Sequence, residues 1–317
     1  MLGKKRQQTT FGELEAEARV PQGHFLRQVD HKIDWQPFQA ELERLNPSRR
    51  GRPSYPPLML FKALLLQCWY NLSDPGLEEA IRDRLSFQRF LGLCLTDPVP
   101  DETTLCRFRG LLTRNGVGPR LLGLLDEQLQ GQGLIVRQGS LVDATLLKAQ
   151  PRPPKKGQAS PDPEADWTRK GKDGHFGYKA HLTVDQGSGL VRRIKLTKAS
   201  HAETHLLEEM LLGDEAAVFA DGAYAKDARK TALRRRGVFC GIVNRAWRFR
   251  GVSPRQHKRN RFFRRIRVAV ERVIGTLKRH YGIERLPYVG QARNWCHLLL
   301  VSMCYNLKRM LVLQGSR

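Results

Sequence analysis

Three acidic residues, far apart in the sequence, lie in patterns that could bring their carboxylates to one site. Asp143 lies in the β-forming run SLVDATLLKA, Asp221 follows the short apolar run VFA, and Glu271 lies in the helical pattern RRIRVAVERVIGTLKRHYG. Clustered carboxylates repel one another unless cations neutralise them, and their hard oxygens suit Mg²⁺ or Mn²⁺. Two such ions, roughly 3.5–4 Å apart, can activate a water or a 3′-hydroxyl and stabilise the leaving oxygen of a phosphodiester. The three acids therefore predict metal-dependent phosphodiester chemistry.

Each acid also has a simpler structural interpretation. Asp143 could cap the segment that follows it, and an Asp-Gly pair such as Asp221-Gly222 usually marks a turn. Glu271 could pair on a helix surface with Arg267, four residues earlier. Such an exposed pair would contribute only about a few tenths of a kcal/mol. Which interpretation holds depends on whether the strands and the helix that carry the three acids bring them together.

The second half of the chain alternates strand and helix patterns. Strands are predicted over 139–149, 178–185, 190–197, 218–220 and 238–244, and helices over 203–212, 225–237, 264–282 and 294–313. Up to the helix at 264–282, this order belongs to the ribonuclease-H-like architecture, an α/β fold with a mixed sheet, in which an antiparallel meander continues into two parallel strands. Its first and fourth strands are neighbours, and a late helix crosses them. The fold would therefore bring Asp143, Asp221 and Glu271 to one edge.

The late helix places Glu271 beside the predicted core. A buried stripe at helical spacing is predicted for Ile266, Val270, Val273 and Leu277. Arg267, Glu271 and Lys278 share a face that borders this stripe. A single acid among cations, next to a packed face, suits a metal ligand beside a phosphate backbone.

The first half of the chain has only helical patterns. Helices are predicted over 34–46, 57–70, 74–84, 86–92, 101–116 and 119–130. We therefore expect a helical N-terminal domain for DNA binding or dimerisation over 1–132 and a catalytic domain over 133–317. Within the latter, 151–177 holds five prolines and no apolar period, which predicts a flexible loop over 150–177.

The charge of the chain favours a polyanionic partner. Its 317 residues include 55 Lys and Arg against 31 Asp and Glu, which gives a net charge of +24. A membrane partner is not expected, because the apolar stretch 57–72 is short for a span and contains Lys62. The N-terminus lacks an apolar signal region, and the six cysteines are scattered, which suits a cytoplasmic protein.

Several basic residues and one tryptophan are candidates for contacts with double-stranded DNA. From Arg229 to Arg285 there are 19 Lys or Arg and two acids, which is too lopsided for mutual pairing. The predicted helix 101–116 could enter a major groove of DNA. The candidate contacts are Arg107, Arg109, Trp167, Arg169, Lys170, Arg261, Arg264 and Arg265.

The chain resembles the DDE transposases of bacterial insertion sequences, and in particular the insertion-sequence-five family. The stretches that carry this resemblance are SLVDATLLKA, VFADGAY and RIRVAVERVIGTLK, together with GRPSYPPLMLFKALLLQCWYNLSDPGLEEAIRDRLSFQRFLGL and DPVPDETTLCRFRGLL. They occur in the family's order and cover most of 30–310. The combination is far more specific than any single motif.

The resemblance implies a set of active-site residues. The family's metal-binding triad falls on Asp143, Asp221 and Glu271, with Mg²⁺ or Mn²⁺ as the cofactor and two ions in each active site. The family's signature around its Glu contains a Tyr, an Arg, the Glu and a Lys. Arg267 and Lys278 match that Arg and Lys and are therefore implied to be catalytic.

The signature is matched incompletely, because Arg264 stands where the family has Tyr. Enzymes of the family nick the ends of a transposon to free a 3′-hydroxyl, which then attacks target DNA. They act as oligomers, usually dimers, without a nucleotide cofactor, and for this chain the resemblance implies a place at the bacterial nucleoid.

Two other functions fit some of the same sequence features. A ribonuclease-H-like nuclease would only hydrolyse phosphodiesters, and a basic DNA-binding regulator would carry a decayed or accidental triad. The intact set of three acids argues against the regulator. The dedicated helical N-terminal domain favours the transposase over a simple nuclease.

Overall fold

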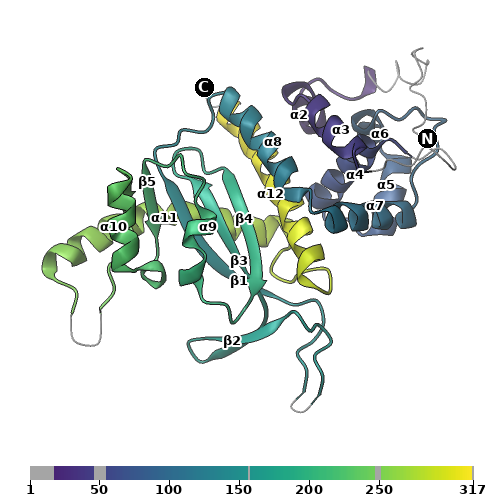
Figure 1. Cartoon of the computed structure of the whole chain (residues 1–317). Helices are drawn as coiled ribbons and strands as arrows, with labels where there is room; N and C mark the ends of the chain where they lie inside the picture. The colour runs from purple at the N-terminus through teal and green to yellow at the C-terminus, as the bar shows by residue number, and fades with distance from the viewer. Residues whose placement is uncertain (1–17, 46–54, 156–157, 247–250, 316–317) are drawn as a thin grey trace. The chain divides into compact units, whose positions relative to one another are not determined.

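The computed structural model describes residues 18–45, 55–155, 158–246 and 251–315. The chain divides into two compact units (Figure 1). Unit 1 consists of Met1–Gln128 with Met310–Arg317, and unit 2 consists of Leu129–Arg309. Two helices, α8 (Gly118–Gly131) and α12 (Gln291–Gly315), contribute residues to both units.

The described part of unit 1 is built from helices. They are α2 (Phe25–Lys32), α3 (Gln36–Glu43), α4 (Pro57–Tyr70), α5 (Asp74–Asp83), α6 (Leu85–Leu91), α7 (Glu102–Asn115) and most of α8. Side chains cap the starts of three of them: His24 accepts from the amide of Leu26, Ser73 from that of Gly76, and Asp101 from that of Thr104. Helix α7 ends at Gly116, which takes the left-handed conformation. These local signals explain why the predicted helices lie close to the observed ones.

Helix α4 is the centre of unit 1 and is buried on nearly all sides. It contains one cation, Lys62, whose ammonium lies 2.6 Å from a carboxylate oxygen of Asp30. The same ammonium lies 4.7 Å from the ring centroid of Trp35 and 4.9 Å from that of Phe90. An acidic partner and two aromatic faces therefore compensate for the burial of this charge.

Unit 2 contains a six-stranded mixed sheet. Its strands are β1 (Ser140–Lys148), β2 (Asp166–Lys170), β3 (Asp173–Asp185), β4 (Val191–Lys198), β5 (Ala217–Ala220) and β6 (Phe239–Cys240). Strand β1 lies between β3, which is antiparallel to it, and β5, which is parallel. Strand β4 continues the antiparallel meander from β3, and β6 runs parallel to β5. This order is ribonuclease-H-like and confirms the predicted fold class.

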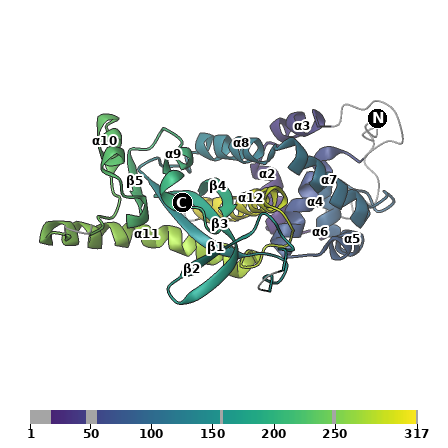
Figure 2. The same cartoon turned by 60° about the horizontal axis from the view of Figure 1, so that its bottom comes forward.

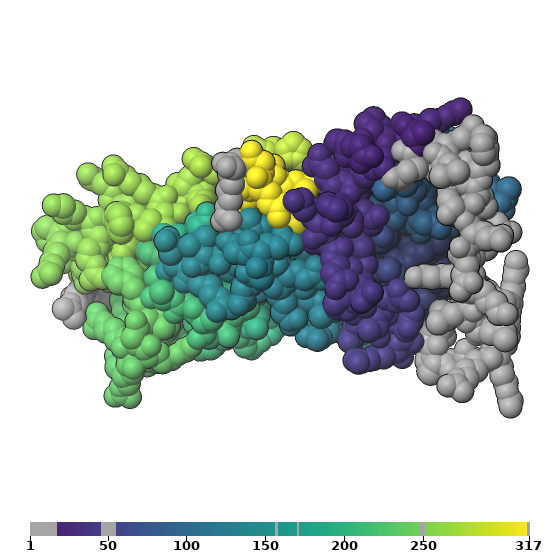
Figure 3. Space-filling view, turned by 90° about the horizontal axis from the view of Figure 1, so that it is seen from above, coloured from purple at the N-terminus to yellow at the C-terminus, as the bar shows by residue number. Residues whose placement is uncertain are grey.

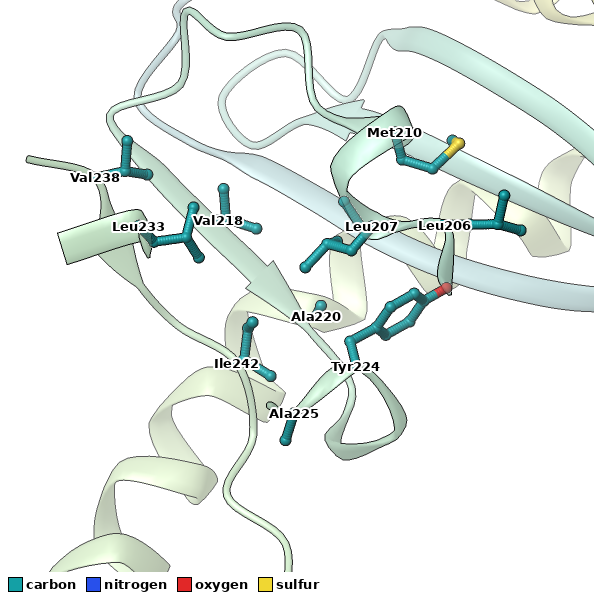
Figure 4. Close-up of a cluster of buried hydrophobic side chains, with 11 residues drawn as sticks. Leu206, Leu207, Met210, Val218, Ala220, Tyr224, Ala225, Leu233, Val238 and Ile242 are labelled. Carbon is teal, nitrogen blue, oxygen red and sulfur yellow. The ribbon is translucent and has the colours of Figure 1, made fainter. Parts of the chain in front are cut away.

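Helices cover both faces of the sheet (Figures 1 and 2). On one face, η1 (Glu203–His205), α9 (Leu207–Met210) and α10 (Asp227–Arg235) enclose an apolar cluster (Figure 4). The cluster consists of Val142, Leu206, Leu207, Met210, Val218, Ala220, Tyr224, Ala225, Leu233, Val238 and Ile242. The long helix α11 (Pro254–Tyr281) crosses β1 and β5 on the other face. Because side chains alternate along a strand, the residues next to Val142 and Ala220 face α11.

The segment 150–177 is not the irregular loop that its composition predicted. Its residues 166–170 form β2, and 173–177 form the first part of β3, with β2 paired antiparallel to it. Just before β2, Asp162 is fully buried and accepts the hydroxyl of Tyr178 at 2.9 and 2.8 Å. Glu164 accepts the amide of Gln291 at 2.7 Å. The buried Asp162 and the contact of Glu164 with the first residue of α12 thus hold this segment in place. Its proline-rich composition did not indicate these contacts.

At Gly177, β3 changes its partner on one side from β2 to β4, while β1 stays its partner on the other side. Gly177 pairs with Lys148 of β1 on one side and Asp166 of β2 on the other, whereas the next residue, Tyr178, pairs with β4. Its φ is 152°, and a Cβ here would lie 2.2 Å from the carbonyl oxygen of Leu147. Only glycine fits this close approach of β1 and β3.

Other elements differ from their predicted lengths. The predicted helix 203–212 is only η1 and the four residues of α9, and the predicted strand 238–244 is only β6. Helix α11 begins at Pro254, ten residues early, where Ser253 and Gln256 form a capping box. Its first turns are polar and basic, so apolar spacing could not indicate them. Helix α2 was not predicted.

Helix α12 is long and apolar enough to cross a membrane by length and composition, and no other helix in the described ranges is. In its most apolar 18-residue window, 61% is buried inside the protein. Leu298 and Cys304, for example, are fully buried. The core helix of a folded domain has the same properties.

Candidate active site

Asp143 lies on β1 and points to the α11 face of the sheet, where its side chain is 16% exposed. One carboxylate oxygen accepts the amide of Ala144 at 2.9 Å, and the other accepts Nη2 of Arg267 at 2.9 Å. Burial raises the pKa of Asp143, and the nearby guanidinium only partly opposes this effect. The ionised carboxylate therefore gains from any additional cation.

Asp221 stands beside Asp143 because of the sheet register. Val142 of β1 pairs with Ala220 of β5, so the next residues along these parallel strands are Asp143 and Asp221. Neighbouring strands lie about 4.8 Å apart. The Asp221 side chain accepts the amide of Gly222 at 2.7 Å and caps η2 (Gly222–Tyr224), and it is 52% exposed. Asp221 is therefore both a turn residue and the neighbour of a second acid.

Arg267 joins the two aspartates. Its Nη2 lies 2.9 Å from Asp143 Oδ2, and its Nη1 lies 3.4 Å from Asp221 Oδ1. Arg267 is buried, and its Nε has no hydrogen-bond partner among the described residues. The predicted core stripe placed Ile266 inside and Arg267 at the border, but Ile266 is half-buried and Arg267 is the buried one. The buried guanidinium of Arg267 therefore reaches from α11 to both carboxylates.

Glu271 and Lys278 lie on the same flank of α11 as Arg267. At 3.6 residues per turn, the three fall within a sector of about 40° around the helix. Lys278 donates from Nζ to the carbonyl of Leu146 at 3.1 Å, so this flank follows β1 from Asp143 onward. Glu271 is exposed, one turn after Arg267. No group of three or more His, Cys, Asp or Glu in the described part of the chain is arranged to hold a metal ion.

The structure thus brings two of the three predicted metal ligands together. Asp143 and Asp221 fit a divalent cation, because they are adjacent hard-oxygen donors and one of them is buried. Arg267 already supplies one positive charge to both. Glu271 would have to extend from the exposed flank to complete the set.

Tyr224 is a nearby residue that sequence reasoning missed. It is fully buried, and its hydroxyl has no hydrogen-bond partner among the described residues. Figure 4 shows this hydroxyl directed from η2 toward Leu206. Burial raises the pKa of Tyr224, and the acids Glu203 and Asp143 raise it further. The Tyr three residues after Asp221 in VFADGAY was the only available signal.

The basic candidates on α11 are at the surface. Arg261, Arg264 and Arg265 are exposed, and together with His257, Asn260 and Val268 they line an open hollow of about 360 Å³. Figure 3 shows the light-green part of the chain, from α10 into α11, at the surface of unit 2. This surface can receive a polyanion.

Three of the other DNA-contact candidates are at the surface. Arg107, Arg169 and Trp167 are exposed, Trp167 at 48%. The backbone of Lys170 pairs in β2, and its side chain lies outside the described part of the structure.

Arg109, in contrast, is buried, so the prediction that it reaches DNA is wrong for this structure. Its guanidinium pairs with Asp74 and lies 3.0 Å from the side-chain oxygen of Gln67. Two residues apart on a helix, Arg107 and Arg109 point in different directions.

Two families of known proteins match this chain. Residues 14–111 match the family Transposase domain (DUF772), and residues 135–307 match the family Transposase DDE domain. The piggyBac transposase synaptic complex with hairpin DNA aligns with 97% of this chain and 76% of its own, at 11% identity and a TM-score of 0.47. The Mos1 strand transfer complex aligns with 89% and 85%, at 10% identity and a TM-score of 0.21. These two structural likenesses are too low to carry the assignment. The DDE match alone spans more than half of the sequence, and the chain therefore belongs to the DDE transposase family and is a DNA transposase.

Proposed function

We propose that this transposase belongs to the insertion-sequence-five family and cuts and joins DNA with Asp143, Asp221 and Glu271 as its metal ligands. Enzymes of the DDE family use divalent metal ions, and we propose Mg²⁺ or Mn²⁺, two ions in each site. The observation that carries the proposal is the pair of aspartates on adjacent parallel strands, joined by one buried guanidinium.

The protein's own residues have distinct tasks in this proposal. Asp143 and Asp221 hold the cation, and Glu271 approaches from the exposed flank of α11. When bound, the ions activate a water or a 3′-hydroxyl and stabilise the leaving oxygen. Arg267 bonds to both aspartates and holds their carboxylates side by side before DNA arrives. Lys278, tied to the carbonyl of Leu146, fixes the helix along β1.

DNA is held, in this proposal, by basic surfaces outside the metal site. Arg261, Arg264 and Arg265 bind phosphates next to the active site, and the exposed Arg107 contributes from unit 1. Trp167 and Arg169 project from the β2–β3 hairpin and contact DNA there. The enzyme acts as a homodimer, because two transposon ends must be processed together.

A strand-transfer assay tests the proposal. The purified protein, Mg²⁺ or Mn²⁺, labelled transposon-end DNA and a supercoiled target are incubated together, and joined products are expected. Asp221→Ala and Glu271→Gln should each abolish cleavage and joining while DNA binding persists. The matched control is Asp227→Asn, whose side chain is 91% exposed on α10 and which should leave activity unchanged.

The assay also separates the alternatives. Cleavage without joining would indicate a nuclease, and DNA binding with neither reaction would indicate a regulator. Normal cleavage by Asp221→Ala or Glu271→Gln would remove the triad from the proposal.

A further inference from the structure

Arg229, on α10, has a side chain that is 5% exposed and makes four hydrogen bonds. Its Nε and Nη2 donate to the two carboxylate oxygens of Glu208, at 2.6 and 2.7 Å. Nη2 also donates to the carbonyl of Thr204 at 2.6 Å, and Nη1 donates to the carbonyl of Tyr224 at 2.6 Å. One guanidinium therefore ties together η1, α9 and η2.

The bond to Tyr224 connects Arg229 with Asp221. The amide of Tyr224 donates to the carbonyl of Asp221 at 3.0 Å, and η2 begins directly after Asp221. Arg229 thus holds one end of a single-turn element whose other end carries the candidate metal ligand. The 3-10 helices η1 and η2 pack against each other, and Arg229 bonds to a carbonyl of each.

Beyond the sheet register that ends at Ala220, Asp221 is held by a bond within its own turn, from the amide of Gly222, and by Arg267. The Asp221 side chain is half-exposed, and its contact with Arg267 is 3.4 Å, longer than a good charged hydrogen bond. The apolar packing of Tyr224 holds η2 from one side, but its hydroxyl contributes no hydrogen bond among the described residues. The guanidinium of Arg229 is therefore the main polar restraint that reaches the backbone of this turn from outside it.

We propose that Arg229 is a positioning residue that fixes η2 so that Asp221 stays beside Asp143 for metal binding. This inference rests on the proposed function of the aspartate pair. Glu208 orients the guanidinium through its bidentate bond, and the pKa of Glu208 is lowered by that bond. A lysine here has a single ammonium and cannot bridge η1, η2 and Glu208 together.

The chain offers a matched control in Arg192. Its side chain is 3% exposed on β4 and makes the same bidentate contact, with Asp214, at 2.9 and 3.0 Å. Replacing either arginine by Gln removes from unit 2 one bidentate ion pair made by a buried guanidinium. Only the change at Arg229 also releases η2.

The experiment is a Mn²⁺ titration of the full chain, followed by electron paramagnetic resonance, for the wild type, Arg229→Gln, Arg229→Lys and Arg192→Gln. Both Gln variants should lower the melting temperature. Arg229→Gln should weaken Mn²⁺ binding at least tenfold, Arg229→Lys should weaken it less, and Arg192→Gln should bind as the wild type does. Affinity for a salt-matched DNA duplex should be unchanged in all of them.

If Arg229→Gln binds Mn²⁺ as tightly as Arg192→Gln does, the positioning role is overturned. If Arg229→Gln does not fold, Arg229→Lys takes its place in this comparison. A wild type that binds no Mn²⁺ would instead overturn the metal site itself, and the positioning role with it. The two failures are therefore distinguishable in one set of titrations.

Discussion

At the scale of single residues, Arg267 occupies the position from which a cation would act on both aspartates. It bonds Asp143 and Asp221 from a buried helix position, so its charge partly offsets the cost of ionising Asp143. A divalent ion would bind the same two carboxylates that this guanidinium binds. The residue therefore prepares the site, and its charge competes with the ion that the site is proposed to bind.

Replacing Arg267 by Gln should expose this dual role. Removing one partner of a buried ion pair costs about 3 kcal/mol, so the metal-free variant should melt well below the wild type. Added Mn²⁺ should recover more stability in the variant than in the wild type, because the ion replaces the lost charge. Differential scanning calorimetry with and without Mn²⁺ measures both effects.

The control for this change is Arg264→Gln, an exposed arginine three residues earlier on the same helix. It removes the same charge without breaking the contact with the aspartates. Equal melting temperatures of the two variants would show that Arg267 does not stabilise the pair.

The ion pair of Asp74 and Arg109 predicts a pH dependence of stability. Burial by itself raises the pKa of Asp74, but hydrogen bonds from Arg109 and Gln67 outweigh it, so the net pKa is lowered. A lowered pKa means that the carboxylate stabilises the fold above its unfolded pKa and loses this contribution as the pH falls through the folded pKa. Asp74→Asn should thus cost about 2 kcal/mol near neutral pH and much less in acid.

Urea unfolding of the wild type and Asp74→Asn at several pH values measures this difference. A cost that stays constant down to acid pH would show that the charge of Asp74 is not the source of its stabilisation. Glu127→Gln, exposed on α8, is the control and should be neutral throughout.

At the scale of elements, the sequence predicted whether a segment is a helix or a strand better than it predicted where the element begins and ends. The alternation of β1, β3 and β4 and the apolar VFA run of β5 were sufficient to predict the sheet, and the register then placed Asp143 next to Asp221. The β2–β3 hairpin was missed because its support comes from Asp162, which is buried by residues distant in sequence. Neither local propensity nor spacing contains that information.

Gly177 makes the packing of β1 on β3 testable. A Cβ at this position would lie 2.2 Å from the carbonyl oxygen of Leu147, which is backbone and cannot move aside. Gly177→Ala should destabilise unit 2 by at least about 2 kcal/mol. Gly123→Ala, on α8, meets nothing within 4 Å and should be neutral or stabilising by about 0.5 kcal/mol.

Chemical denaturation of both alanine variants, followed by circular dichroism, gives the comparison. A stability of Gly177→Ala equal to that of Gly123→Ala would mean that β1 and β3 leave room for a Cβ at Gly177.

At the scale of the whole molecule, the net charge of +24 governs how the chain meets DNA. Composition was enough to predict a polyanionic partner, and the run from Arg229 to Arg285 indicated where. Composition could not show which cations are already used internally, because pairs such as Arg109 with Asp74 and Arg229 with Glu208 form only in the folded chain. The exposed arginines of α11 are among those that remain available to phosphates.

Neutralising Arg261, Arg264 and Arg265 together should weaken DNA binding and flatten its salt dependence. Each lost phosphate contact reduces the slope of log K against log salt by about 0.9, so the slope should fall by about 2–3. Fluorescence anisotropy over a range of salt concentrations measures the slope.

The matched control neutralises Arg44, Arg82 and Arg120, which are also exposed but are paired with acids on their own helices. This triple variant should change the slope little. An equal loss in both triple variants would show that net charge alone, and not the α11 surface, determines binding.

The central claim is that Asp143 and Asp221 form the metal site, with Arg267 between them until the metal arrives. The most direct measurement is a crystal structure of the protein soaked with Mn²⁺, in which anomalous scattering locates the ion. We predict an anomalous peak bound by both aspartates, with Glu271 turned toward it and the guanidinium of Arg267 moved off at least one carboxylate. An anomalous peak elsewhere, with Arg267 still joining the two aspartates in protein that joins DNA, would contradict the claim.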